Sequence, residues 1–189
     1  MSTFSLTFQG SSIGSVTLPI LENSSDPITF TINWGDGVTD SLLTHNYGSV
    51  TGPYTAVLSI TSGSVSRFGL FGWTGGDKLI QVATNNNNTW GLPGVTSFQN
   101  AFAQCTALIS VPLGIPSSVT NMNNMFISAF VFNQNINTWD VSNVTNMIQM
   151  FAAAFAFDQP LNNWNVSNVN TMEGMFTSAI KFNQPLNNW

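Results

Sequence analysis

Charge is the scarcest property of this chain. Only 6% of its 189 residues are charged, and the cations are Arg67, Lys78 and Lys181 alone. Typical soluble domains carry about 25% charged residues. Nucleic acids and anionic membranes are bound through clustered Lys and Arg. With a formal net charge of -5, the sequence therefore predicts neither of these partners.

Side chains that carry catalysis or bind metals are equally rare. The chain has one histidine, His45, and one cysteine, Cys105, which we expect to be buried. Nucleophile–base pairs and His/Cys metal sites need more of both types. Three loop carboxylates lack the spacing of a calcium loop: Asp26, Asp36 and Asp40. We therefore expect no enzyme activity, no cofactor and no metal.

Long apolar runs are also missing. No stretch of about 18 apolar residues is present, so no membrane span is expected. The first 20 residues lack the basic segment and the unbroken apolar segment of a signal peptide. Glycines at 69, 72, 75 and 76 match neither the P-loop nor the dinucleotide-binding pattern.

What the chain does contain is a repeat. Trp139, Trp164 and Trp189 stand 25 residues apart, and each follows a Met-x-x-Met-Phe run. A unit of this length cannot bury its apolar face alone, so the units must stack and share one core. A diverged first unit precedes the three clear ones. The units are 95–118, 119–143, 144–168 and 169–189.

Spacing within one unit predicts a helix and a strand. Five apolar residues fall at helical spacing: Val144, Met147, Met150, Phe151 and Ala154. The bulky stretch around Trp164 favours an extended chain, which would pair with its neighbours in a short parallel sheet. The repeats, 95–189, are therefore predicted to form an α/β solenoid with one short strand and one short helix per unit. Repeated methionines are assigned to its core.

The N-terminal third has a different pattern. Apolar and polar residues alternate at period two through residues 1–64, which predicts antiparallel strands of a small β-sandwich. Residues 65–94, with a short strand expected at 79–82 and a polar loop at 85–89, are interpreted as a connector and a cap for the solenoid. The fold class is therefore predicted to be α+β.

Two sets of motifs resemble known families. The order Ile32-Asn-Trp-Gly-Asp-Gly37, His45-Asn-Tyr47 and Gly52-Pro-Tyr-Thr-Ala-Val-Leu58 resembles the polycystic-kidney-disease-type (PKD-like) sandwich. The repeated string F-N-Q-x-[IL]-x-x-W-[DN]-V-S-N-V-x-x-M-x-x-M-F resembles the BspA-like leucine-rich-repeat surface proteins, a repeat domain of unknown function. The second resemblance implies a leucine-rich-repeat-like solenoid. It also implies a non-enzymatic protein on a cell or particle surface, engaged in adhesion or other protein contact.

Two hypotheses of function follow. In the first, a polar face of the solenoid binds a protein or glycan on another cell or surface. Regularly spaced amides and carboxylates would supply the hydrogen bonds. The candidate residues are Asn137, Asp140, Asn162, Asn163, Asn165, Asn187 and Asn188.

In the second hypothesis, the chain is a structural subunit. An apolar layer in the last unit would stack end to end on another copy and build a filament or surface layer. The candidate assembly residues are Met172, Met175, Phe176, Phe182, Leu186 and Trp189. Both hypotheses place the protein outside the cell, on the cell surface or on a virion, although the chain shows no recognisable signal peptide.

Overall fold

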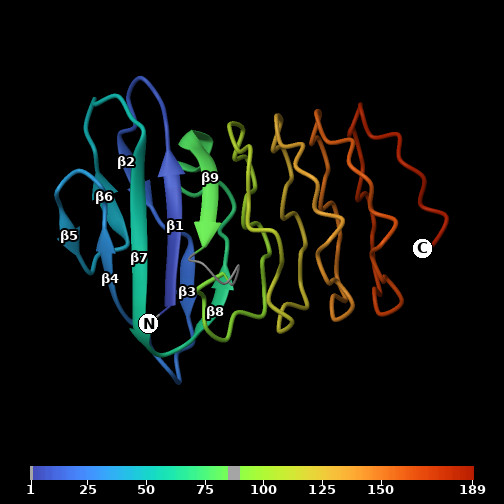
Figure 1. The fold of residues 1–189 in the computed structure, drawn as a ribbon, viewed down its shortest axis with the longest axis horizontal. Coiled ribbons are helices and arrows are strands. Elements are labelled where there is room, and N and C mark those ends of the chain that lie inside the picture. The colour runs from blue at the N-terminus through green and yellow to red at the C-terminus, as the bar shows by residue number, and fades with distance from the viewer. Residues whose placement is uncertain (1, 85–89) are drawn as a thin grey trace.

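The protein is elongated, with a β-sheet region at one end and a stack of turn-rich layers at the other. The computed structural model describes residues 2–84 and 90–189. Figure 1 shows the layers lying side by side along the long axis, from the sheet to the C-terminal residues. Buried side chains from Phe4 to Met175 form one continuous core. We call residues 95–189 the repeat stack.

A five-stranded antiparallel sheet forms the first part of this core. Its strand order is β5-β4-β7-β1-β9, with β1 pairing antiparallel to both β7 and β9. The strands are β1 (Ser2–Phe8), β4 (Thr29–Asn33), β5 (Thr39–Asp40), β7 (Tyr54–Ser62) and β9 (Leu79–Thr84). Alternate side chains of β1, such as Phe4, Leu6 and Phe8, are buried, as the period of a strand requires.

Two shorter pairs of strands lie outside this sheet. β2 (Ser15–Thr17) pairs with β6 (Thr44–Asn46), and β3 (Ile20–Glu22) pairs with β8 (Val65–Phe68). A single 3-10 turn, Gly76–Lys78, leads from β8 into β9. The segment after residue 64 therefore pairs twice with the N-terminal region, through β8 with β3 and through β9 with β1. The polar loop expected at 85–89 lies outside the described residues.

The predicted α+β fold class, with its α/β solenoid of one strand and one helix per unit, is wrong. No α-helix occurs among the described residues, and 90–189 contain no strand. Strand-like pairing between successive units is limited to isolated parallel bridges, which join Ser97, Asn121, Asn146 and Thr171. In the part of the chain that the structure describes, no helix is long and apolar enough to cross a membrane.

Consecutive tight turns replace the predicted helix. The Met150 N–H donates to the Met147 carbonyl at 3.2 Å, and the Ala154 N–H donates to the Phe151 carbonyl at 3.0 Å. The third residue of each turn has positive φ, 51° at Gln149 and 54° at Ala153, as in type II turns. Successive four-residue turns bury positions i, i+3, i+4 and i+7, which is also the helical pattern.

In a helix, backbone N–H groups would donate hydrogen bonds within the same segment. Here several of them donate to the next layer instead. Each donor in the third unit lies 2.8–3.0 Å from its acceptor in the fourth. These bonds run from the N–H groups of Met147, Gln149, Phe151 and Ala153 to the carbonyls of Thr171, Glu173, Met175 and Thr177. The layers are thus held together by their main chains, with no continuous strand.

Aromatic side chains stack in the same register. Phe126, Phe151 and Phe176 form a row with ring centroids 5.5 and 5.7 Å apart. Each repeat tryptophan donates its indole N–H to a backbone carbonyl of the preceding layer. These bonds join Trp139 to Pro112, Trp164 to Ile136 and Trp189 to Leu161, at 3.0, 3.1 and 3.2 Å. The 25-residue tryptophan period is therefore the period of an interlayer hydrogen bond.

Candidate functional site

The single histidine stabilises a loop of the sheet region. His45 Nε2 lies 2.7 Å from a carboxylate oxygen of Asp36, and its ring stacks on Trp34 at 4.9 Å. Partial burial acts to raise the pKa of Asp36, but hydrogen bonds from His45 and the Val38 N–H bring the pKa below its ordinary 3.8. The side chains of His45 and Asp36 are therefore both occupied by contacts within this region.

Asp36 and Asp40, two of the three carboxylates considered for calcium, stabilise the same local structure. Asp40 accepts the indole N–H of Trp34 at 3.1 Å and the Leu42 N–H at 3.0 Å. Within the described ranges, no group of three or more His, Cys, Asp or Glu side chains could hold a metal ion. As predicted, Cys105 is buried, and its burial raises the pKa of the thiol well above the ordinary range.

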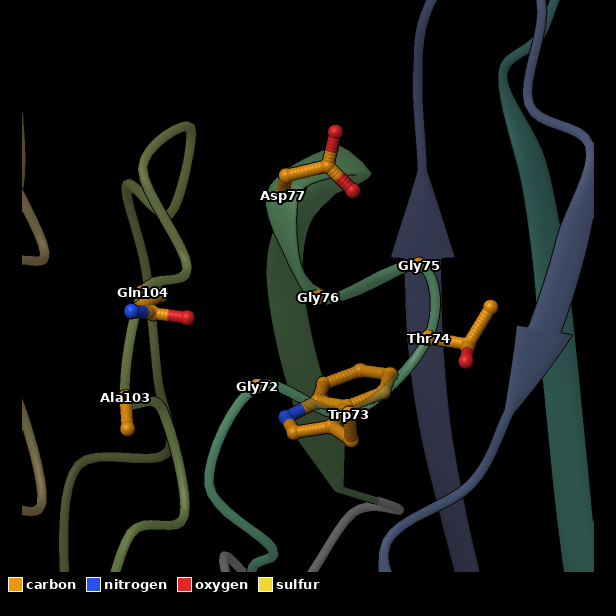
Figure 2. Close-up of a pocket in the computed structure, with 8 residues that line it drawn as sticks. All are labelled: Gly72, Trp73, Thr74, Gly75, Gly76, Asp77, Ala103 and Gln104. Atoms are coloured by element: carbon orange, nitrogen blue, oxygen red, sulfur yellow. The ribbon is translucent and has the colours of Figure 1, made fainter.

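A hollow of about 370 Å³ lies between the glycine-rich loop before β9 and the first repeat. Figure 2 shows Gln104 on the opposite loop from Trp73, with the Thr74 and Asp77 side chains pointing away from Gln104. Asp77 is paired with Lys78. A catalytic site requires polar groups that converge on one point. The polar groups of this hollow do not converge in this way.

Most residues of the predicted polar face make hydrogen bonds between layers or within a layer. Asn137 accepts the backbone N–H of Asn163 at 2.9 Å. Asp140 and Asn165 each accept an N–H two residues further on, at 3.0 and 3.1 Å. Hydrogen bonding from Ser142 keeps the pKa of Asp140 below 3.8. The Asn162 carbonyl accepts from the Asn188 amide at 3.3 Å, while Asn187 is exposed.

The residues of the predicted assembly layer lie together in the fourth unit. Phe176 and Phe182 stack at 3.9 Å. Met172, Met175, Phe176, Leu186 and Trp189 line a hollow of about 420 Å³, together with Gly174 and Thr177.

One apolar surface escaped the sequence prediction. Phe130, Phe155 and Ile180 occupy the same position in three successive units, with exposed fractions of 39%, 38% and 77%. The rings of Phe130 and Phe155 stack at 4.8 Å with an interplanar angle of 6°. We call these three residues the Phe ridge. Their own 25-residue period was the signal in the sequence that could have identified them.

Residues 96–189 match a protein-family model. Its description is "Mycoplasma protein of unknown function, DUF285". All three residues of the Phe ridge lie within the DUF285 match, as do the Met-x-x-Met-Phe runs and the repeat tryptophans from Trp139 onwards. The chain matches no curated protein and no solved structure.

A second apolar feature lies outside the DUF285 match, in the sheet region. A hollow of about 260 Å³ opens between β3 and β4. We call it the β3–β4 hollow. It is lined by Ile20, Leu21, Ile28, Phe30 and Leu43, with Glu22 as its charged residue. The Glu22 carboxylate accepts the Ile28 N–H at 3.0 Å, which holds this carboxylate at the hollow.

Proposed function

We propose that this chain is a non-catalytic module that binds a protein partner through the Phe ridge. The observation that carries the proposal is the contrast between two phenylalanine positions. Phe130 and Phe155 are more than one-third exposed, whereas Phe132 and Phe157, two residues further on, are fully buried. A contiguous row of exposed apolar side chains is typical of an interaction site. Removing this surface from water on binding is favourable, at about 25 cal/mol per Å².

The stacking of the ridge favours a protein partner over a glycan. Because Phe130 and Phe155 lie face to face, each ring covers one face of the other, so half of the ring faces of this pair are closed to a ligand. An aromatic ring is electron-rich on its face and electron-poor at its edge. Sugar C–H groups are electron-poor and need the ring face, whereas aliphatic protein side chains pack well against edges.

The polar face is a weaker candidate for the same role. Asn137, Asp140 and Asn165 already accept hydrogen bonds from the chain's own backbone. A ligand that used these oxygens would compete with bonds that hold the layers and turns. Exposed apolar groups face no such competition.

The resemblance of the repeats to BspA-like surface proteins supports the same proposal, because that resemblance implies contact with other proteins. On the same basis we propose that the module lies on a cell or particle surface. The match to DUF285, a family of unknown function, is compatible with this proposal.

A binding screen tests the proposal. The chain is presented on an array of purified surface and extracellular-matrix proteins, on an array of glycans, and on immobilised copies of itself. The double variant Phe130→Ser/Phe155→Ser is compared with Asn165→Ser from the polar face. Retained unfolding midpoints establish that both variants are folded.

We expect binding to at least one immobilised protein, weakened at least about tenfold by the ridge substitutions and unchanged by Asn165→Ser. Binding to glycans alone, or binding lost with Asn165→Ser and retained in the ridge variant, would overturn the proposal.

A further inference from the structure

We propose that the partner of the Phe ridge is a second copy of this chain, whose β3–β4 hollow receives Phe155. The inference rests on the proposed function, since it names what the ridge binds. One molecule carries both surfaces: a protruding apolar row on the repeat stack and an apolar recess on the sheet region.

The sizes of the two surfaces fit. A cavity of about 150 Å³ lined by apolar side chains holds one benzene ring. The β3–β4 hollow, about 260 Å³, therefore has room for one phenyl ring and part of a neighbouring aliphatic chain. Phe155 is the central residue of the ridge, and Ile180, the most exposed of the three at 77%, occupies the equivalent position in the next unit.

The charges at the two surfaces are complementary. Lys181 directly follows Ile180 and is exposed, and it is one of only three cations in the chain. Glu22 is the charged residue of the β3–β4 hollow and is exposed too. Seating the ridge in the hollow brings an ammonium group and a carboxylate to the same rim. Such a pair contributes more to orientation and specificity than to affinity.

The geometry of this contact determines what it builds. Ridge and hollow are different surfaces, so the contact is heterologous, and the copies at the two ends of an open chain still offer one free ridge and one free hollow. Association then continues head to tail instead of stopping at a dimer. The apolar area is small, so we expect weak association that depends on concentration.

Sedimentation velocity of the full chain, from micromolar to millimolar, provides the test. Ridge variant Phe155→Ser/Ile180→Ser and hollow variant Leu43→Trp, which fills the recess without burying a charge, are run alone and mixed. Ile109→Ser removes a 58% exposed side chain outside the ridge and serves as the matched control. A second series uses Glu22→Lys, Lys181→Glu and the two combined.

We expect the wild type and Ile109→Ser to grow beyond dimers, and each ridge or hollow variant alone to stay monomeric. Their equimolar mixture should stop at a heterodimer, because only one intact ridge and one intact hollow remain. Glu22→Lys and Lys181→Glu should each weaken association, and the combined swap should restore it. This restoration does not depend on how well Leu43→Trp folds.

A monomeric wild type at every concentration would overturn the inference. So would continued self-association of both Leu43→Trp and Glu22→Lys, which would indicate contact of ridge with ridge. In either case, ridge-dependent binding to another protein on the array would leave the proposed function standing. Absence of any ridge-dependent binding would contradict both the proposed function and the inference that a second copy is the partner.

Discussion

The indole N–H of Trp164 donates to the backbone carbonyl of Ile136, one layer earlier, across 3.1 Å. Trp164 is 2% exposed and Ile136 is fully buried, so water cannot replace the bond. A buried carbonyl left without a donor costs about 1–3 kcal/mol. The repeated tryptophan is therefore a hydrogen-bond donor between layers as well as a core side chain.

Replacing this tryptophan tests that role. We expect Trp164→Phe to lower the free energy of unfolding by about 1–3 kcal/mol, measured by urea denaturation, since it removes the donor and part of the ring. Trp73→Phe is the matched control. Trp73 is also buried, but its indole N–H has no acceptor of normal hydrogen-bond geometry and lies beside the Cys105 thiol. Equal losses in the two variants would contradict the role of the hydrogen bond.

The turns make a prediction about glycine. Ala153 has φ 54°, a region that an L side chain occupies at a cost of about 1–2 kcal/mol per residue. Ala153→Gly should therefore raise the unfolding free energy by about 1 kcal/mol. Ala154→Gly, one residue on, should lower it, because Ala154 is buried and not among the positive-φ residues. Thermal denaturation of the two variants compares them directly, and destabilisation by Ala153→Gly would argue against the turns.

These turns explain why the secondary structure of the repeats could not be predicted from their pattern. The spacing of Met147, Met150, Phe151 and Ala154 is common to a helix and to consecutive four-residue turns. A helix and consecutive turns differ in the acceptors of their backbone N–H groups. In the repeats many of these acceptors belong to the neighbouring layer, so the sequence of one unit does not reveal them. The non-glycine Gln149 and Ala153 at positive φ gave no warning. Asn100, Asn124 and Gly174, at the positions equivalent to Gln149, also have positive φ. Asn and Gly are the residue types that adopt this region most readily, so they were the local sign.

Other features followed from residue type and period. The stacking of units, the burial of the methionines in the second and third units and the burial of Cys105 all rest on apolar side chains leaving water, and all are observed. Exposure within a unit was harder to predict. Phe155 and Phe157 are chemically identical and two residues apart, yet only the path of the turn decides which one faces the core.

That pair gives a third prediction. Phe157 is fully buried and stacks on Phe151 at 4.1 Å, so Phe157→Ser should cost about 3–5 kcal/mol or more. Phe155→Ser should change the unfolding free energy by less than about 1 kcal/mol, because its ring is 38% exposed. Urea denaturation measures both. Similar losses would show that Phe155 is a core residue, which would weaken its assignment to an interaction surface.

Asp158 gives a prediction about pH. Its carboxylate accepts the Asn183 N–H at 2.9 Å and the Gln184 amide at 2.8 Å, and these bonds, that of Gln184 first, lower the pKa of Asp158 below 3.8. A lowered folded pKa means that the ionised form stabilises the fold. The contribution is complete above the ordinary pKa and is lost as pH falls through the folded pKa.

Asp158→Asn separates the charge from the hydrogen bonds. Asn133, one layer earlier, accepts the equivalent pair of bonds, so an amide suits the position. Between about pH 5 and about pH 2 the wild type should lose more stability than Asp158→Asn, measured by urea midpoints. Asp158→Ala should be less stable than both at neutral pH. Identical pH profiles for wild type and Asp158→Asn would contradict the assignment.

Photo-crosslinking from the ridge identifies the residues that Phe155 contacts when the chain self-associates. The full chain is made with Phe155→benzoylphenylalanine, irradiated at a concentration where it self-associates, and digested for mass spectrometry. We predict cross-links from position 155 to residues 20–43 of a second copy, and we predict that Leu43→Trp abolishes them. Cross-links confined to the repeat stack, or no cross-link between copies, would contradict it.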